Sequence, residues 1–319
     1  MEITQAKDTD INEIIGLLKI SLGEALMPKS EAYFVWKHFK NPFGKSIIYL
    51  AKENEKIIGI RAFMHWSWAD KDNVITSVRA VDTATHPDFQ GKGIFSKLTL
   101  EAVKKSIDEK IGFVFNTPNP ISMIGYLKLG WYSIGRMPVY FMPNFSIPHF
   151  YISGNVDELY NSYSAKNAID QLPLNWQLKS SKDIMDTPLT KEYLYWRYVD
   201  CPVAKYGAIV IPNHYGFIFR IKKVNRFMEL RLCELWIENS DAHNDFNKAL
   251  NLLKKQLKPL FVSCAASPLL KTKSQIPPGF YGPIKKGPVV TLKHLALNNL
   301  NIFEDFSKWN PSLGTMELF

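Results

Sequence analysis

The segment His86-Pro-Asp-Phe-Gln-Gly-Lys-Gly-Ile-Phe-Ser-Lys-Leu98 decides how the first half of this 319-residue chain is interpreted. It joins an apolar strand to an amphipathic helix through two glycines, Gly91 and Gly93. The spacing of the apolar residues that follow predicts a helix opening near Gly93 or Ile94. The first turn of a helix has unpaired backbone N–H groups and partial positive charge, so it suits a phosphate. The segment therefore predicts a main-chain cradle for a pyrophosphate.

Known phosphate motifs narrow this interpretation. No G-x-x-x-x-G-K-[ST] loop fits the segment, and a dinucleotide fingerprint needs a third glycine where Ser96 stands. An ordinary glycine-containing loop before a helix is the structural alternative. The hexapeptide Gln90-Gly-Lys-Gly-Ile-Phe95 resembles the acetyl-CoA motif of the GNAT superfamily, [QR]-x-x-G-x-[GA], except that Phe95 replaces the expected small residue. The resemblance implies that the cofactor is held by Gln90, Gly91, Lys92, Gly93, Ile94 and Phe95.

A second motif follows where that superfamily has it. The buried strand Phe113-Val-Phe115 leads into Asn116-Thr-Pro-Asn-Pro-Ile-Ser-Met-Ile-Gly-Tyr-Leu-Lys-Leu-Gly-Trp131. This resembles the superfamily's strand, asparagine turn, short tyrosine-bearing helix and closing Lys-x-Gly-aromatic. The two motifs together cover roughly residues 78 to 131.

The resemblance assigns roles to two residues of the second motif. Tyr126 matches the general-acid tyrosine whose hydroxyl lies near the CoA sulfur; the alternative is a tyrosine whose ring packs in the core. Asn119 matches the turn asparagine that helps to hold the cofactor arm, and a local Asx turn or helix cap is equally compatible with it.

The strand before the glycine turn carries a third candidate, Asp82. Alternation along Val78-Arg-Ala-Val-Asp-Thr-Ala-Thr85 predicts Asp82 on the same face as Val78, Ala80 and Ala84. A carboxylate on an apolar face is costly unless it is paired or functional. Asp82 is therefore either a general base or the partner of an arginine such as Arg61.

Main-chain groups on the same strand have a family counterpart. The resemblance implies that those of Thr83 and Thr85 pair with the pantetheine amides of the cofactor. Such a role requires no particular side chain.

Other histidines and aromatics receive structural interpretations. His38 and His86 have no partners at metal-ligand spacing, so surface or packing roles are expected and no metal is predicted. An aromatic set could line an acceptor pocket, but core packing is favoured; it comprises Tyr33, Trp36, Phe63, Trp66 and Trp68.

Composition excludes several classes of protein. The net charge is +9, but lysine and arginine are scattered, which argues against nucleic-acid binding and fits a surface that attracts anionic CoA. Cys201, Cys233 and Cys264 form no C-x-x-C pair, so no disulfide framework is indicated and a reducing cytoplasm fits best. The first residues lack a secretory pattern, and no apolar run approaches a membrane span.

An internal repeat indicates two similar halves. Residues 33–45, YFVWKHFKNPFGK, align without a gap on residues 193–205, YLYWRYVDCPVAK, and two strands follow each copy. We expect domains at 1–148 and 149–319, with a linker near 143–155 where several prolines fall. The second half lacks a glycine turn and a match to Tyr126. It is interpreted as a degenerate domain that shapes the acceptor site or only stabilises the protein.

The predicted fold is α/β (α+β), with two GNAT-like domains, each a mixed, mostly antiparallel sheet flanked by helices. The implied activity is an acetyl-CoA-dependent N-acetyltransferase acting on a small-molecule, sugar or peptide amine in a ternary complex. Two alternatives remain: a CoA-binding sensor or scaffold without turnover, and an acyl or aminoacyl transferase acting on a cell-envelope precursor.

Overall fold

The computed structural model describes residues 1–25, 27–144, 156–224, 227–238, 241–266, 279–295 and 304–316. The chain forms two compact units, one from Met1–Gly135 with Val289–Phe306 and the other from Arg136–Pro288 with Ser307–Leu318. The boundary expected between residues 148 and 149 lies outside the described residues.

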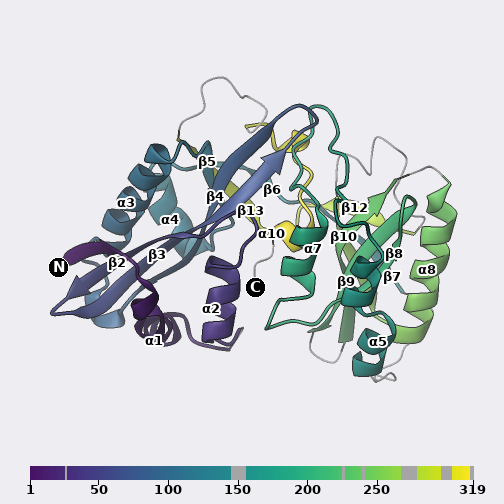
Figure 1. Ribbon diagram of the computed structural model, residues 1–319, viewed down its shortest axis with the longest axis horizontal. Coiled ribbons are helices and arrows are strands. Elements are labelled where there is room, and N and C mark those ends of the chain that lie inside the picture. Colours follow the sequence, from purple (N-terminus) through teal and green to yellow (C-terminus); the bar gives the residue numbers. More distant parts are fainter. Residues whose placement is uncertain are drawn as a thin grey trace. The chain divides into compact units, whose positions relative to one another are not determined.

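The first unit is built on a mixed sheet (Figure 1). Its strand order is β1-β2-β3-β4-β5-β13-β6. β4 and β5 pair in parallel, while β1/β2, β2/β3, β3/β4 and β5/β13 are antiparallel. The strands are β1 (Glu2–Gln5), β2 (Ile47–Glu53), β3 (Lys56–Ala69), β4 (Val74–Thr85), β5 (Phe113–Asn116), β6 (Tyr132–Arg136) and β13 (Val289–His294).

Helices cover both faces of this sheet. Apolar residues of α1 and α2 pack with Ile60, Ala62 and Ala84 on one face. Residues of α3 and α4 pack with Phe63, Val78 and Ala80 on the other. The helical segments are η1 (Asp8–Asp10), α1 (Ile11–Leu22), α2 (Glu31–His38), η2 (Pro87–Phe89), α3 (Ile94–Asp108) and α4 (Pro120–Lys128). The aromatic set singled out in the sequence is buried in this unit, as expected for core packing.

A β-bulge interrupts β4 at the centre of the unit. Val81 is paired with Ala62 and Ala84 with Ile60, so two β4 residues, Asp82 and Thr83, lie opposite the single residue Arg61. A bulge inserts one residue and reverses the faces of the residues beyond it. The prediction that Ala84 shares a face with Val78 and Ala80 was therefore wrong, because Ala84 packs on the α1/α2 side.

The second unit has the same kind of sheet, in the order β12-β7-β11-β10-β9-β8. β10 and β11 are parallel, and β8/β9, β9/β10, β7/β11 and β7/β12 are antiparallel. The strands are β7 (Val139–Pro143), β8 (Gly207–Ile211), β9 (Tyr215–Val224), β10 (Phe227–Ile237), β11 (Phe261–Ala265) and β12 (Tyr281–Ile284). The helical segments are α5 (Val156–Ser162), α6 (Ala165–Asp170), α7 (Lys191–Tyr198), α8 (Ala242–Leu257), η4 (Phe306–Lys308) and α10 (Leu313–Met316).

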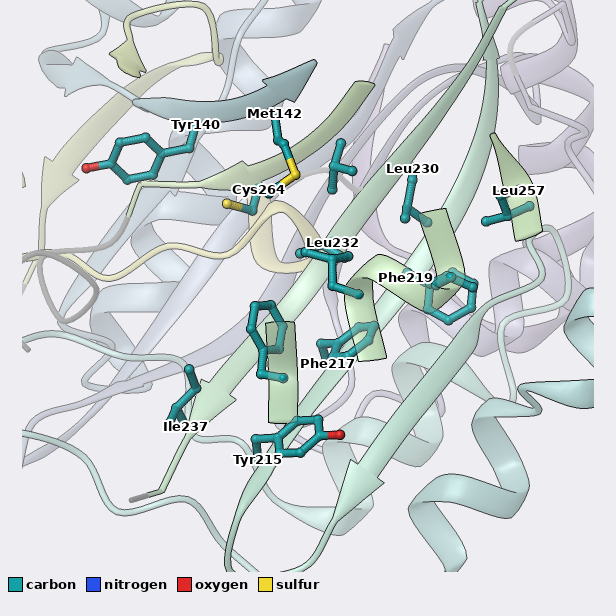
Figure 2. Close-up of a cluster of buried hydrophobic side chains, with 14 of the residues drawn as sticks. Tyr140, Met142, Tyr215, Phe217, Phe219, Leu230, Leu232, Ile237, Leu257 and Cys264 are labelled. Atoms are coloured by element: carbon teal, nitrogen blue, oxygen red, sulfur yellow. The ribbon is translucent and has the colours of Figure 1, made fainter. Parts of the chain in front are cut away.

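The core of the second unit joins β7 to the strands that follow much later. Figure 2 shows Tyr140 and Met142 of β7 near Cys264 of β11, together with the ring of Phe217 and the side chain of Leu232. α8 contributes an apolar face to the same cluster: Ala242, Phe246, Leu250, Leu253 and Leu257.

Both halves build equivalent elements from the repeated sequence, which confirms the tandem fold. Ser30 caps α2 by accepting a hydrogen bond from the amide of Tyr33, and Thr190 caps α7 by accepting one from Tyr193. Each capped helix leads into a pair of antiparallel strands, and a bulge follows in the next strand of both units, between Leu232 and Glu234 in β10. The two copies of the repeat, residues 33–45 and 193–205, thus share their local structure as well as part of their sequence.

The two sheets exchange one strand each, which the sequence does not reveal. β13, near the end of the chain, lies between β5 and β6 in the first sheet. β7, which directly follows β6, lies between β11 and β12 in the second. Each sheet therefore contains a strand encoded in the other half.

Candidate functional site

The glycine turn opens α3 as the sequence predicts. α3 begins at Ile94 with Gly93 as its N-cap, and Gly91 and Gly93 have φ values of +74° and +73°. Non-glycine residues adopt this left-handed conformation at a cost. Gln90, Gly91, Lys92 and Gly93 are exposed. The main chain that leads into the first turn is therefore exposed, and the amides of that turn have no intrahelical acceptor.

Two contacts define the surroundings of this turn. A Cβ at Gly59 of β3 would come within 2.6 Å of Ile94, so the absence of a side chain there allows α3 to approach closely. Lys92 stays at the surface with its Nζ 4.5 Å from the centre of the Phe89 ring. Its charge adds to that of the helix N-terminus.

Tyr126 of α4 lies beside the start of α3. It is buried, and its ring is 5.5 Å from that of Phe95 and 5.4 Å from that of Trp131. The Phe95 ring also packs on Gly125, where a Cβ would lie 2.9 Å from it. The unexpected bulk of Phe95 is thus accommodated by the glycine that precedes Tyr126.

Asn119 and the β4 threonines have clear local roles. The Asn119 side chain caps α4 by accepting a hydrogen bond from the amide of Ser122 at 2.8 Å, as the helix-cap alternative predicts. The carbonyl of Thr85 accepts hydrogen bonds from Gln90 and Ser21, and the hydroxyl of Thr83 accepts one from Nη1 of Arg61. His86 also serves as a cap, accepting a hydrogen bond from the amide of Asp88.

Asp82 is ion-paired on the α2 side of the sheet. Its Oδ2 accepts hydrogen bonds from Lys37 Nζ at 2.9 Å and from His38 Nε2 at 2.8 Å. The suggested pairing of Asp82 with Arg61 was wrong, because the bulge directs Asp82 toward α2. Its backbone has φ +39°, a left-handed value that the surrounding bonds must hold in place.

Electrostatics define the charge states of this cluster. Burial raises the pKa of Asp82, but Lys37 and His38 outweigh it and hold that pKa far below its usual range. Burial lowers the pKa of Lys37, yet the attraction of Asp82 leaves it raised, whereas burial prevails at His38 and lowers its pKa. Lys37 and Asp82 are thus a charged pair. Neutral His38 donates from Nε2 to Asp82 and accepts at Nδ1 from the Ser46 hydroxyl, 2.9 Å away.

Sequence reasoning missed Lys37 and His38 as partners of the bulge. The signal was available in the repeat, which aligns Lys37 with Arg197 and His38 with Tyr198. In the second unit the Tyr198 hydroxyl donates to Oε1 of Glu234 at 2.5 Å, and Glu234 directly follows that unit's bulged residue. In both units, therefore, an acidic side chain at the bulge is bonded to the helix formed by the repeat: Asp82 to α2, and Glu234 to α7.

A cavity of about 110 Å³ lies in the second unit beside Glu234. β10 and β11 are paired only as far as Arg231 and Ser263, and the cavity opens where they separate, with Cys264 and Ser312 in its lining. β4 and β5 separate in the same way after Arg79 and Phe115. The separation of the two parallel strands is thus common to both units.

Glu234 makes the stability of the second unit depend on pH. Burial raises its pKa from 4.5 to about 7, against the hydrogen bonds from Tyr198 and Ser312. Between these two pH values the folded state retains a proton that the unfolded state has lost. The contribution of Glu234 to stability is therefore full below pH 4.5 and is lost, by about 3 kcal/mol, as the pH rises to 7. Replacement by Gln should flatten this slope, as measured by urea unfolding at pH 5 and pH 8.

The exposed neighbour Glu238 supplies the control for this measurement. Glu238→Gln should retain the full dependence of the wild type. An unchanged slope in Glu234→Gln would contradict the assignment to Glu234.

Other kinds of site are not indicated in the described parts of the chain. There, no group of three His, Cys, Asp or Glu residues is arranged to hold a metal ion. No described helix combines the length and apolarity needed to cross a bilayer.

Comparison with known protein families gives a match to the first unit. The family model described as an acetyltransferase (GNAT) domain matches residues 2–134. No curated protein matches the chain in sequence.

Solved structures extend the likeness to both units. A GCN5-related N-acetyltransferase from Anabaena variabilis has a TM-score of 0.62 at 13% identity, over 92% of this chain and 72% of that one. A probable N-acyltransferase from Enterococcus faecalis has 0.63 at 10%, over 93% and 73%. Eis1 from Mycobacterium abscessus has 0.58 at 11%, over 93% and 74%. At these identities the likeness establishes a shared two-domain fold.

Proposed function

We infer, from the premise that residues 2–134 form a domain of the GNAT acetyltransferase family, that the protein is an acetyl-CoA-dependent N-acetyltransferase acting on a primary amine. The observation that carries this proposal is the exposed opening of α3, where Gly91 and Gly93 hold left-handed backbone. Amides without intrahelical acceptors and the helix dipole would receive the cofactor diphosphate there. Gln90, Lys92, Ile94 and Phe95 complete the proposed turn.

The reaction we propose is direct attack in a ternary complex. The neutral amine adds to the thioester carbonyl, the C–S bond breaks, and the nitrogen loses one proton as the amide forms. That proton balances the one that the departing thiolate takes up. Tyr126 would give its proton to the departing thiolate as general acid, and Asn119, Thr83 and Thr85 would hold the cofactor arm. The thiolate, with a free pKa of about 8.5, needs only roughly 2 kcal/mol of help toward protonation at pH 7.

Asp82 was a candidate general base, and its ion pair favours the structural alternative. A carboxylate that accepts hydrogen bonds from two cationic or donor side chains has little affinity for another proton. We propose that Asp82 acts as a positioning residue that keeps the bulge, and with it Thr83, in place.

The second unit receives a supporting role in this proposal. The sequence between β10 and α8, residues 238–241, contains no glycine, so no equivalent diphosphate cradle is expected. We assign the unit to acceptor recognition or to stability. The acceptor class is a small-molecule, sugar or peptide amine, with no nucleic-acid or membrane partner. The three free, buried cysteines support a cytoplasmic location.

Titration with acetyl-CoA and a thiol-release assay over a panel of amines test this function. Saturable binding together with amine-dependent release of CoA supports an acetyltransferase. Binding without release for any amine would favour the CoA sensor, and absence of binding would remove the acyl donor altogether.

The role of Tyr126 has its own test. Tyr126→Phe should lower kcat by about a hundredfold or more, the usual contribution of a positioned acid. Affinity for acetyl-CoA should change little, because the ring contacts with Phe95 and Trp131 remain. Tyr132→Phe, on a neighbouring strand, serves as the control, and unaltered turnover in Tyr126→Phe excludes it from catalysis.

A further inference from the structure

Arg61 is a buried cation in the first unit that the proposed mechanism does not use. It is the β3 residue opposite the bulge and has no exposed surface. Its guanidinium carbon lies 4.9 Å from the ring centre of Tyr126, 5.0 Å from that of Phe63 and 5.3 Å from that of Phe95. Arg61 therefore lies on the α3/α4 face, beside the proposed general acid.

Two of its donors are unsatisfied. Nη1 donates to Thr83, whereas Nε and Nη2 are buried and have no hydrogen-bond partner among the described residues. Leaving charged donors buried and unpaired is strongly unfavourable. These two nitrogens form one edge of the guanidinium, and their parallel N–H groups match the two oxygens of a carboxylate.

No protein carboxylate fills this edge in the described structure. Asp82, the acid of the bulge, faces α2 and binds Lys37 and His38. The three rings offer their faces to the cation but no hydrogen-bond acceptor for the free edge. An anion fits the edge better than a neutral carbonyl, because it would also neutralise the charge.

We propose that Arg61 receives the free carboxylate of a dicarboxylic acyl group, so that the preferred donor is an acyl-CoA of the succinyl type rather than acetyl-CoA. This rests on the proposed acyl transfer from CoA and replaces acetyl-CoA as the preferred donor. Arg61 shares a face with Tyr126, which is assigned to the cofactor sulfur, so the carboxylate belongs to the donor rather than the amine. Because Arg61 is fully covered, the partly exposed ring of Phe95 or that of Tyr126 moves aside when the donor binds.

Succinyl-CoA and butyryl-CoA test the proposal, since they have acyl chains of equal length that differ by the carboxylate. The wild-type protein should bind succinyl-CoA at least about tenfold more tightly, the value of a charged hydrogen-bonded contact. Arg61→Gln should reduce this ratio to about one. Arg61→Lys keeps the charge but loses the paired donors. Its preference for succinyl-CoA over butyryl-CoA should lie between those of the wild type and Arg61→Gln.

Arg79→Gln is the matched control, because Arg79 is also buried but its Nη2 donates to Thr117. Its succinyl preference should equal that of the wild type. Equal wild-type affinity for the two thioesters would overturn the inference even if Arg61→Gln failed to fold, while acetyl-CoA binding would still support the acetyltransferase. A preference for glycine over glycinamide as acceptor, with none between donors, would move the carboxylate to the amine and also overturn it. Failure to bind any acyl-CoA would contradict both proposals.

Discussion

The Gly93→Val variant is expected to lose acyl-CoA affinity by at least about a hundredfold, or roughly 2.8 kcal/mol, while the protein remains folded. Gly93 caps α3 at φ +73°, and a β-branched residue at such a φ is strained. No atom lies within 4 Å of the Cβ position, so the effect comes from backbone strain rather than a clash inside the protein. Relief of the strain would turn the first-turn amides away, and the side chain would obstruct the ligand.

Calorimetric titration of acetyl-CoA measures this loss, with circular dichroism to confirm folding. Gly16→Ala is the control: Gly16 lies within α1, has free space at its Cβ and lacks a positive φ. It should bind acetyl-CoA as the wild type does and be slightly more stable, by about 0.5–1 kcal/mol. Full affinity in Gly93→Val would place the diphosphate elsewhere.

Loss of the Asp82 charge should produce the largest change in stability. Asp82→Asn leaves Lys37, which is almost fully buried, without its anion. Removing one partner of a buried ion pair typically lowers the free energy of unfolding by about 3–5 kcal/mol. Because the folded pKa of Asp82 is lowered, the pair stabilises the protein above pH 3.8 and its contribution is lost as the pH falls.

Urea unfolding at pH 7 measures the effect, and two further variants define its origin. Lys37→Met combined with Asp82→Asn should recover part of the loss, since no unpaired charge remains buried. Asp157→Asn, which removes an exposed ion pair with Lys205, should leave stability nearly unchanged. Wild-type stability in Asp82→Asn would show that the pair does not hold the bulge.

The glycine turn and its helix could be predicted from the sequence because the interactions involved are local. Gly93 ends up as the N-cap of α3 since its backbone freedom is a property of the residue itself. Asn119 was recognisable as a possible cap because this interaction is also local. Its side-chain oxygen accepts a hydrogen bond from the amide of Ser122, only three residues further along the chain. The repeat also predicted two strands after each copy; the helices formed by the copies themselves, capped by Ser30 and Thr190, were not predicted.

The bulge and the charges around it could not be predicted in this way. Strand alternation assumes an unbroken period of two, which the bulge interrupts. Asp82 has a left-handed backbone, and an aspartate does not indicate this conformation in a sequence as a glycine would. Its partners come from α2, more than forty positions away. The unsatisfied edge of Arg61 depends on the same bulge, since the register opposite Arg61 determines which side chains reach it.

The exchange of β7 and β13 has a consequence for how the molecule is made. During synthesis from the N-terminus, the first sheet lacks the strand between β5 and β6 until residues 289–294 leave the ribosome. All strands of the second unit precede β13 in the sequence, so the N-terminal half cannot complete its sheet as an independent folding intermediate. Completion of the first sheet is thereby coupled to translation of the second unit's strands, and termination before residue 289 would leave the first sheet one strand short.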